Sequence, residues 1–469
     1  MMLGAVAKEA AERFGDTTAY VAPDGSALTY ADLDRHADEV AAGLAKEGVG
    51  EGDVVALVLP QTPQYVIAYV AAARLGAITA GVNTRLSAPE RAAVLAIADP
   101  RLTIDSPAAV DGRRVTGAPP TPVDDDPERP VAIVFTSGTT GTPKGAVFAN
   151  RQLAFITGTD TGGDWGGGGT TFAATSFAHL GPMTKLPGSL MRGGTTHVLA
   201  RWRAADALRM IAEHRMASFG GIPTQAALML QDPAFDRHDL SCVKAIVLGG
   251  GPASPALVRE ARDRFGAAVA IRYSCTEAGI GIGTAFDAPA EDAEVSVGRP
   301  HAGVDLELRD VVGEVGEVCL RSPAVMAGYW RAPDLTEATM TPDGFVRTGD
   351  LGWIDDAGRL RLVGRSKEMY VRGGYNVYPM EVEGVLAAHP AIADVAIAPR
   401  PDDVMGEVGV AVIVPREGTS APTVDELRTF AEDRLARYKL PEAVIAVDAM
   451  PLTAMEKLDR KALAAIVAG

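Results

Sequence analysis

The stretch VAIVFTSGTTGTPKG, residues 131–145, joins an apolar run to a loop of glycines, hydroxyl side chains and one lysine. The apolar run is typical of a strand buried inside a parallel sheet. Ligands of open α/β sheets bind beyond the carboxyl ends of such strands. Because glycine frees backbone amides and Lys144 adds an ammonium group, the loop is suited to an anion, and phosphate is the expected one.

A solvated surface loop is the ordinary alternative for this composition, but the position of the loop after a buried strand favours a ligand site. The spacing differs from that of the P-loop motif, because Gly138 and Gly141 are three positions apart and Pro143 precedes Lys144. The sequence therefore predicts a phosphate loop of another kind.

Helix and strand patterns alternate upstream of this loop. Helices are predicted at 29–48, 62–76 and 91–99, and strands at 53–60 and 101–105. Thr29 caps the first helix, Pro63 lies in the first turn of the second, and Ser87 and Glu90 form a capping box before the third. This alternation predicts a parallel sheet covered by helices.

The pattern changes several times downstream. Residues 106–130 are rich in proline and charge and predict an exposed connector, and the glycine-rich residues 157–171 predict a mobile surface loop. Short strands with turns from about 294 to 365 predict a β-rich subdomain, and a compact α+β tail follows it.

The bulk composition limits the classes of partner, site and compartment that are compatible with the chain. A chain of 469 residues suggests about two to four domains. The net charge of −16 argues against a nucleic-acid partner and against a polybasic membrane anchor. Cys242, Cys275 and Cys319 form no CxxC pair, which indicates a reducing compartment and no structural zinc site. Without a signal peptide or a long apolar span, the chain is expected to be a soluble cytoplasmic protein with no membrane contact.

Three further stretches have the character of ligand loops. LGGGPAS at 248–254 follows an apolar run, and its glycines allow a flat ring or a phosphate to approach. RYSCTEAG at 272–279 offers Glu277, a carboxylate suited to Mg²⁺ beside phosphate. RTGDLG at 347–352 places Asp350 in a predicted turn, where it could accept hydrogen bonds from ribose. Each stretch alone is explained by an ordinary turn.

Together, in this order, the stretches closely resemble those of the ANL superfamily of adenylate-forming enzymes, which includes acyl-CoA ligases, adenylation domains of nonribosomal peptide synthetases and luciferases. TSGTTGTPKG resembles their phosphate loop nearly residue for residue, and YSCTE is similar to their Tyr-Gly-x-Thr-Glu motif, with Ser274 in place of glycine. RTGDLG, GRSKEMYVRGGYNVYPMEVE and KLDR also match. The resemblance covers essentially the whole chain.

The resemblance implies an α/β fold with a large N-terminal domain, residues 1–365, that contains the parallel sheets and the β-rich subdomain. It implies a small, mobile α+β C-terminal domain, residues 366–469, that rotates about a hinge at Lys367 and Glu368. The implied reaction is activation of a carboxylic acid by ATP, with Mg²⁺, to an acyl-adenylate, followed by transfer to the thiol of coenzyme A.

The resemblance also implies the roles of individual residues. Catalytic roles fall to Lys457, Thr276, Glu277, His179 and Lys144, with Glu277 as the Mg²⁺ ligand. The nucleotide would be bound by Thr136, Ser137, Gly138, Thr139, Thr140, Gly141, Lys144, Gly250, Gly251, Pro252, Arg272, Tyr273, Ser274, Cys275, Thr276, Asp350, Arg365 and Lys457. The acyl pocket would contain His179, Gly181, Gly220, Gly221 and Ile222. The coenzyme A tunnel would contain Arg372, Gly373, Gly374 and Tyr375.

One departure from the family pattern concerns the residues before Lys457. The family usually has Thr-Gly-Lys, whereas this chain has Met455 and Glu456 before the lysine. Either Glu456 points to solvent without effect, or it weakens or abolishes adenylation. In the second case the chain would accept an acyl-adenylate made by a partner enzyme and perform thioester formation alone.

Two other functions remain open from the sequence. One is a stand-alone adenylation enzyme that loads a separate carrier protein. The other is a non-catalytic acyl or nucleotide sensor, against which the intact phosphate loop and Glu277 argue. The sequence leaves the identity of the acid open, and a monomer and a homodimer are both compatible with it.

Overall fold

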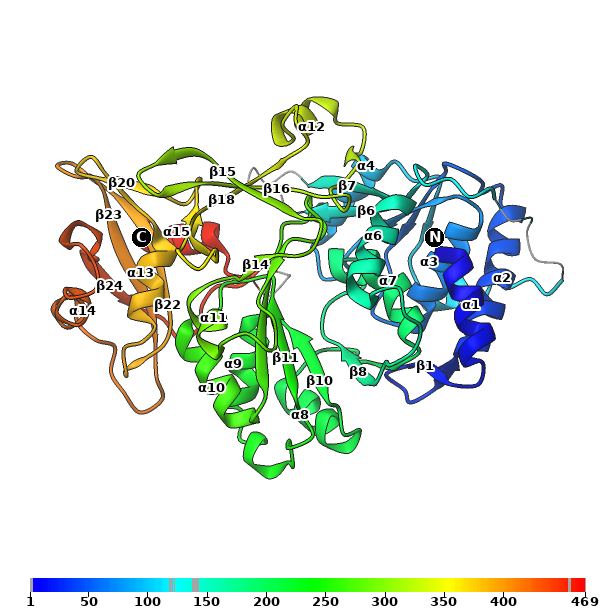
Figure 1. The fold of residues 1–469 in the computed structure, drawn as a ribbon, viewed down its shortest axis with the longest axis horizontal. Helices are drawn as coiled ribbons and strands as arrows, with labels where there is room; N and C mark the ends of the chain where they lie inside the picture. The colour runs from blue at the N-terminus through cyan, green and yellow to red at the C-terminus, as the bar shows by residue number, and fades with distance from the viewer. Residues whose placement is uncertain (1–2, 118–120, 122, 137–142, 454–456, 469) are drawn as a thin grey trace.

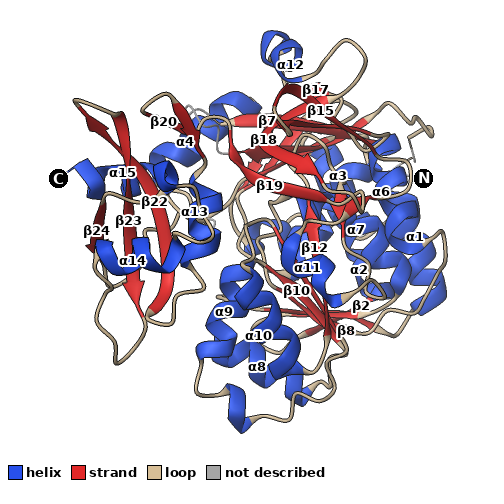
Figure 2. Cartoon of the chain, turned by 60° about the vertical axis from the view of Figure 1, so that its left-hand side comes forward, coloured by secondary structure: helices blue, strands red, loops and turns tan. Residues whose placement is uncertain are grey.

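The computed structural model of the chain describes residues 3–117, 121, 123–136, 143–453 and 457–468. The described residues form five sheets with helices around them. In Figure 1 the chain runs from the blue N-terminal part through the green middle to the orange C-terminal part at the opposite end. Figure 2 shows that helices flank the sheets in all three regions.

The largest sheet contains the strand that precedes the phosphate loop. Its six strands have the order β17-β7-β6-β4-β3-β5. Strands β5, β3, β4 and β6 pair in parallel, whereas β7 and β17 are antiparallel additions. The bounds are β3 Val54–Leu57, β4 Ile78–Gly81, β5 Leu102–Ile104, β6 Pro130–Thr136, β7 Lys144–Ala149 and β17 Gly328–Tyr329.

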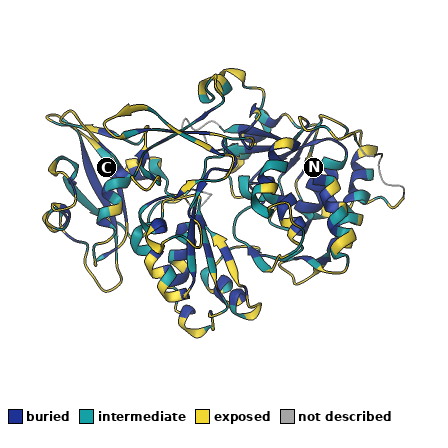
Figure 3. Ribbon diagram, in the orientation of Figure 1, coloured by how far each residue is buried: buried dark blue, intermediate teal, exposed yellow. Residues whose placement is uncertain are grey.

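Helices surround this sheet and bury its residues in two hydrophobic clusters, whose inner faces are dark blue in Figure 3. Capping residues that were predicted from the sequence mark the beginning of two of these helices. The Thr29 hydroxyl accepts a hydrogen bond from the amide of Asp32, and Ser87 and Glu90 form the expected capping box. The bounds are α1 Leu3–Phe14, α2 Tyr30–Lys46, α3 Pro63–Arg74, α4 Ala88–Ala98, α6 Asn150–Thr161 and α7 Leu180–Arg192.

Two further sheets are also parallel at their centres. One has the order β2-β1-β9-β8, and the other has the order β10-β11-β12-β13-β14 with α8, α9, α10 and α11 beside it. The bounds in the first are β1 Thr18–Val21, β2 Ala27–Thr29, β8 Thr170–Ala173 and β9 Thr195–Val198. The bounds in the second are α8 Ala204–Glu213, β10 Ser218–Gly221, α9 Pro223–Gln231, η1 Phe235–Arg237, β11 Ala245–Gly249, α10 Pro255–Phe265, β12 Ala268–Tyr273, β13 Ile282–Gly283, α11 Ala290–Val295 and β14 Arg299–Pro300.

The β-rich segment forms an antiparallel sheet in the order β15-β16-β18-β19. The bounds are β15 Asp305–Val312, β16 Val315–Arg321, β18 Val346–Ile354 and β19 Leu360–Arg365, with the helix α12 Pro333–Thr339 between β17 and β18. The strand expected near residue 294 is replaced by the end of α11 and the two-residue β14.

The C-terminal sheet has the order β21-β20-β23-β22, with β24 parallel to β23. Helices α13 and α15 pack against β22. The bounds are β20 Tyr370–Arg372, β21 Tyr375–Val377, α13 Pro379–Leu386, β22 Ile392–Asp402, β23 Gly406–Pro415, α14 Val424–Ala431, η2 Arg437–Lys439, β24 Ala443–Ala446 and α15 Arg460–Ala468.

Two loop predictions are wrong in part. Within the expected connector, the helix α5 (Pro107–Asp111) buries Val110, and Arg129 is buried next to β6. The expected glycine-rich loop is shorter than 157–171, because its first residues complete α6 and Thr170 begins β8. The burial of Val110 stabilises α5, and the hydroxyls of Thr159 and Thr161 donate to the carbonyl oxygens of Phe155 and Thr157 within α6.

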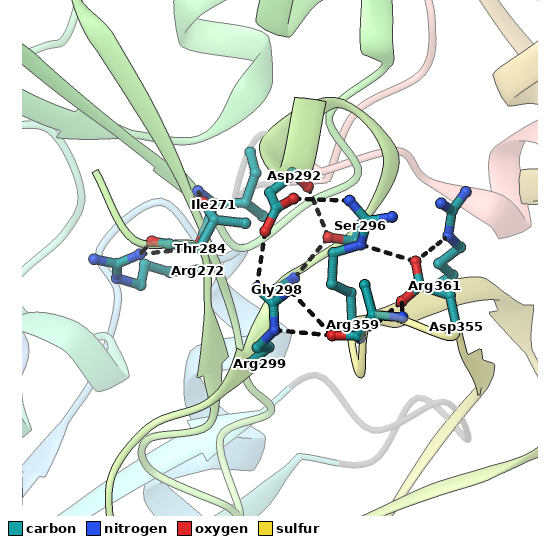
Figure 4. Close-up of polar contacts among 11 residues, drawn as sticks. Ile271, Arg272, Thr284, Asp292, Ser296, Gly298, Arg299, Asp355, Arg359 and Arg361 are labelled. Carbon is teal, nitrogen blue, oxygen red and sulfur yellow. Dashed lines mark hydrogen bonds and ion pairs between the residues drawn. The ribbon is translucent and has the colours of Figure 1, made fainter. Parts of the chain in front are cut away.

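A buried ion-pair network joins the middle sheet to the β18–β19 hairpin (Figure 4). The Asp292 carboxylate in α11 accepts hydrogen bonds from Arg299 at 2.8 Å and from Arg359 at 2.7 Å. Arg359 also pairs with Asp355 at 2.8 Å. Burial raises the pKa of Asp292, but the two arginines outweigh this and leave the pKa lowered overall.

We expect Asp292→Asn to lower the free energy of unfolding by about 3 kcal/mol, because removing one charge of a buried network strands the others. The Asp292 side chain is only 4% exposed, so solvent cannot replace it. Urea denaturation measures the change, and the matched control is Asp287→Asn at an exposed position nearby. Equal stability of the two variants would contradict a structural role for the network.

Among the described residues, no helix is both long enough and apolar enough to cross a membrane.

Candidate active site

Three parallel strands end side by side at the edge where the ligand loops were predicted. Gly221 of β10 lies opposite Leu248 of β11, and Gly249 of β11 lies opposite Arg272 of β12. Gly250 follows with a φ of +78°, a conformation that side chains other than glycine rarely adopt. A Cβ on Gly249 would lie 2.8 Å from the carbonyl oxygen of Arg272, so these positions require glycine to keep the strand ends close.

Asp350 lies at the centre of a polar cluster beside this edge. The structure corrects the predicted turn, because Asp350 belongs to β18, directly opposite Arg365 of β19. Tyr273 donates its hydroxyl to Asp350 Oδ2 at 2.8 Å, and Arg365 donates Nε to Oδ1 at 3.0 Å. A carboxylate has about four lone-pair positions, so capacity for further donors such as ribose hydroxyls remains.

The side chain of Arg272, which was predicted to bind the nucleotide, makes its contacts away from the predicted ligand edge. Its guanidinium donates to the carbonyl oxygens of Ile271 at 3.0 Å and Thr284 at 2.6 Å. It also lies 5.7 Å from the centroid of the Phe286 ring. These contacts turn the charge toward β13 (Figure 4), so only the backbone of Arg272 is left for the ligand edge.

Tyr329 connects two of the predicted catalytic residues, and the sequence reasoning missed it. Its hydroxyl donates to Glu277 Oε1 at 2.5 Å, and the Lys144 ammonium lies 5.1 Å from the centroid of its ring. Burial, followed by the charge of Glu277, raises the pKa of Tyr329, so this hydroxyl keeps its proton. The structure therefore brings the phosphate-loop lysine and the carboxylate of the second motif to one place.

The residues between Tyr273 and Glu277 are partly buried. Burial raises the pKa of the Cys275 thiol, and the Glu277 charge raises it further, so Cys275 is unsuited to act as a nucleophile. Ser274 donates its hydroxyl to the carbonyl oxygen of Cys275 at 3.1 Å. The Thr276 carbonyl accepts the amide of Gly279, which holds the motif in a compact turn.

A cavity of about 460 Å³ lies next to this edge. Among the residues predicted for the acyl pocket, His179 and Ile222 line it, whereas Gly181, Gly220 and Gly221 are not part of its described wall. The other lining residues were not found from the sequence and are Gln61, Asn83, Arg85, Ala174, Thr175, Ser176, Ala200, Arg201, Trp202 and Gln225. They come from loops after β3, β4, β8 and β9 and, in the case of Gln225, from the first turn of α9, and these segments are distant in sequence.

Lys457 reaches this region from the C-terminal part of the chain. Its neighbour Leu458 forms an isolated antiparallel bridge with Leu452, and Lys457 itself is exposed. Desolvation of the ammonium by the surrounding protein lowers the pKa of Lys457, and the charge of Arg365 lowers it further. The carboxylate of Asp350 opposes this shift. Lys457 also acts electrostatically on His179. The Lys457 ammonium is therefore close enough to both Asp350 and His179 to interact with them electrostatically.

His179 is held neutral at pH 7. Its ring Nε2 lies 3.3 Å from Asn83 Nδ2, and burial, Lys457 and Arg85 lower the pKa of His179 to about 4. The unfolded chain binds a proton near pH 6.5, whereas the folded chain does not. Stability should therefore fall as the pH drops from about 6.5 to about 4, by at most about 3 kcal/mol at 1.36 kcal/mol per pKa unit.

We expect His179→Gln to reduce this dependence between pH 6.5 and 4, because glutamine does not titrate. Urea denaturation at pH 4.5 and pH 7 measures it in both proteins. An unchanged difference between the two pH values would show that His179 is not the group responsible.

The predicted coenzyme A residues lie on the β20–β21 hairpin. Arg372 forms an ion pair with Glu442, and the Tyr375 ring stacks on Tyr438 at 4.6 Å. Gly373 and Gly374 form the turn, with φ of +56° and +86°. All of these contacts are made within the C-terminal sheet and its own helices.

The predicted hinge follows β19. Glu368 forms an ion pair with Arg460 of α15 at 3.3 Å, and Lys367 is exposed. Several residues singled out in the sequence lie outside the described residues: Ser137, Gly138, Thr139, Thr140, Gly141, Met455 and Glu456. Thr136 and Lys144, which flank the phosphate loop, face each other as paired residues of β6 and β7.

Comparison with known proteins gives two family matches. The model of the AMP-binding enzyme family matches residues 7–330. The model of the AMP-binding enzyme C-terminal domain matches residues 381–457. Together the two models span most of the chain.

Individual relatives agree in length and fold. A feruloyl-CoA synthase from an Amycolatopsis species is 34% identical, with 92% of this chain and 93% of that protein covered. The amide bond synthetase McbA from Marinactinospora thermotolerans is 27% identical with a TM-score of 0.88, and both chains are covered fully. The o-succinylbenzoate CoA synthetase from Bacillus subtilis, solved with its acyl-adenylate intermediate, is 27% identical with a TM-score of 0.84, over 98% and 97% of the two chains.

Proposed function

The chain belongs to the AMP-binding enzyme family, and from this premise we propose that it is an acyl-CoA ligase that forms a thioester through an acyl-adenylate. The observation that carries the proposal is the contact of Tyr329 with both Glu277 and Lys144, in the segment whose Tyr273 also donates to Asp350. The cavity lined by His179 is a second supporting observation. The named relatives that make CoA thioesters support the choice of thiol acceptor.

The proposed reaction has two steps. A carboxylate oxygen of the acid attacks the α-phosphorus of ATP, the bond to the bridging oxygen breaks, and pyrophosphate leaves. The thiolate of coenzyme A then attacks the acyl carbon of the adenylate, and the carbon–oxygen bond to AMP breaks. The first step gathers negative charge on phosphate and carboxylate oxygens, which fixed cations and amide donors stabilise.

We assign the residues as follows. Asp350 accepts hydrogen bonds from ribose hydroxyls, and the glycine turn at Gly250 and Gly251 receives the adenine. Lys457 neutralises charge between the reacting carboxylate and the α-phosphate. Neutral His179 orients the acid without adding charge, in line with its lowered pKa.

Mg²⁺ is implied by the family, and the described residues fit it only in combination with substrate. Among them, no three His, Cys, Asp or Glu side chains converge into a metal cluster. A single carboxylate, Glu277, oriented by Tyr329, suits an ion that takes its other ligands from phosphate oxygens and water. Bound there, Mg²⁺ would neutralise phosphate charge and help pyrophosphate leave.

We further propose that residues 366–469 rotate as a unit between the two steps, with Lys367 and Glu368 as the hinge. The separate hydrophobic core of this part supports the proposal. In the present arrangement Lys457 interacts electrostatically with Asp350, whereas the printed side-chain contacts of Arg372 and Tyr375 in the β20–β21 hairpin are to Glu442 and Tyr438 of the C-terminal part. A rotation would exchange these two surfaces at the site.

The test is product analysis with ATP, MgCl₂, coenzyme A and a panel of aliphatic and aromatic carboxylic acids. Acyl-CoA and AMP in equal amounts for at least one acid are the expected products. Weak product formation from ATP that increases with Met455→Thr and Glu456→Gly would agree with an adenylation step impaired by Glu456. Acid-dependent AMP release without any thioester would argue for another acceptor.

A further inference from the structure

Asn83 follows β4 in a turn that fixes the direction of its side chain. Its backbone carbonyl accepts the amide of Leu86 at 3.2 Å, and its side-chain oxygen accepts the amide of Arg85 at 2.9 Å. The second bond is that of an Asx turn, which Asn commonly forms with the residue two positions on. Asn83 is only 7% exposed, so neighbouring atoms restrict its side chain further.

The bond from Arg85 also decides which end of the Asn83 amide meets His179. The amide oxygen has to face the Arg85 N–H, because an amide nitrogen in its place would set two donors against each other. Nδ2 is therefore the atom that lies 3.3 Å from His179 Nε2. Because an amide NH₂ group only donates hydrogen bonds, Nε2 has to be the acceptor.

An accepting Nε2 places the proton of the neutral imidazole on Nδ1. The charged ring is disfavoured, because His179 is the N-cap of α7 and the N-terminus of a helix repels positive charge. Arg85 and Lys457 act on the ring in the same direction, and the described lining of the cavity contains no Asp or Glu to oppose them. Among the described residues Nδ1 has no hydrogen-bond partner, although the ring lines the cavity.

We propose that Asn83 is a positioning residue that holds His179 in the neutral tautomer with the proton on Nδ1, so that His179 offers the acyl group a hydrogen-bond donor without a charge. This inference rests on the proposed function where it takes the cavity as the acyl pocket. The acceptor on the substrate side is an oxygen atom of the acyl group.

Nitrogen-15 NMR of the full-length chain with labelled histidine tests the tautomer without any substrate. The chain has seven histidines, and the signals absent from the spectrum of His179→Gln identify His179. At pH 7 we expect a protonated Nδ1 and an unprotonated Nε2. A proton on Nε2 in the unmodified protein would overturn the proposal.

Asn83→Asp keeps the acceptor for the Arg85 amide but replaces the donor at His179 by a second acceptor. Its His179 should carry a proton on Nε2, alone or together with one on Nδ1. Asn376→Asp makes the same change at an exposed position of β21 and should leave the His179 signals unchanged. An Asn83→Asp protein that keeps the unmodified tautomer would show that Asn83 does not set it.

Thioester formation from a panel of supplied acyl-adenylates shows whether the tautomer matters to the substrate. Asn83→Asp is expected to raise the KM for the acyl-adenylate about tenfold, the size of one lost hydrogen bond, and to leave the KM for coenzyme A unchanged. An equal rise of both KM values would contradict a role at the acyl group. If no acyl-adenylate reacts in the unmodified protein, the proposed function fails, whereas the NMR spectra still decide the tautomer.

Discussion

Lys457→Ala is expected to lower ATP-dependent adenylate formation by about 10²–10³-fold while leaving acyl transfer from a supplied adenylate within a few-fold of the unmodified protein. The loss corresponds to removing one fixed donor aimed at charge that develops in the transition state. Lys457 is a cationic side chain that interacts electrostatically with both Asp350 and His179. Pyrophosphate exchange measures the first step, and single-turnover thioester formation measures the second.

The control for Lys457 is Lys461→Ala, which removes an exposed lysine on α15. Its exchange rate should stay unchanged, and the thermal midpoint of both variants should match that of the unmodified protein. If Lys457→Ala slowed both steps equally, the lysine would not be specific to adenylation. If the starting exchange is already near the detection limit, Lys457→Ala is made in the background of Met455→Thr with Glu456→Gly.

Glu277→Gln is expected to reduce adenylate formation by about 100-fold and to raise the Mg²⁺ concentration needed for half-maximal rate. The substitution keeps the shape and the hydrogen bond from Tyr329 but removes the charge that would hold the ion. Because each 1.36 kcal/mol of barrier is tenfold in rate, the expected loss is about 2.7 kcal/mol of transition-state stabilisation. Initial rates over a Mg²⁺ titration measure both effects.

Two further variants separate the role of charge from that of orientation. Tyr329→Phe removes the hydrogen bond to Glu277 but keeps its carboxylate, so a smaller loss of about tenfold is expected. Glu291→Gln changes an exposed carboxylate on α11 and should have no effect. A Glu277→Gln protein with full activity and an unchanged Mg²⁺ requirement would remove Glu277 from the site.

The fold could be predicted from local sequence patterns, because these patterns depend on the backbone conformation and the burial of neighbouring residues. The alternation of helices and strands, the caps at Thr29 and Ser87, and the glycine turn after β11 could each be read within a few residues. Family membership depended on the order of the motifs, and the comparisons confirm it.

The parts that the sequence did not give depend on contacts between distant segments. Tyr329 meets Glu277 because the two-residue strand β17 pairs with β7 and the amide of Met326 donates to the carbonyl oxygen of Glu277, and a strand as short as β17 carries no periodic signal. Asp350 was expected in a turn because Thr-Gly-Asp is turn-like, but Gly349, with a φ of +73°, lies within the irregular strand β18. Arg201 lines the cavity from a loop whose sequence has no motif.

The most direct measurement of the central claim is transfer from supplied acyl-adenylates to competing acceptors. Purified protein is mixed with a panel of acyl-adenylates, coenzyme A, an amine and a phosphopantetheinylated carrier protein, and the acylated products are quantified by mass spectrometry. We expect acyl-CoA to form fastest, with release of one AMP per thioester. Preferential formation of an amide or an acylated carrier protein, with no enzyme-dependent acyl-CoA, would contradict it.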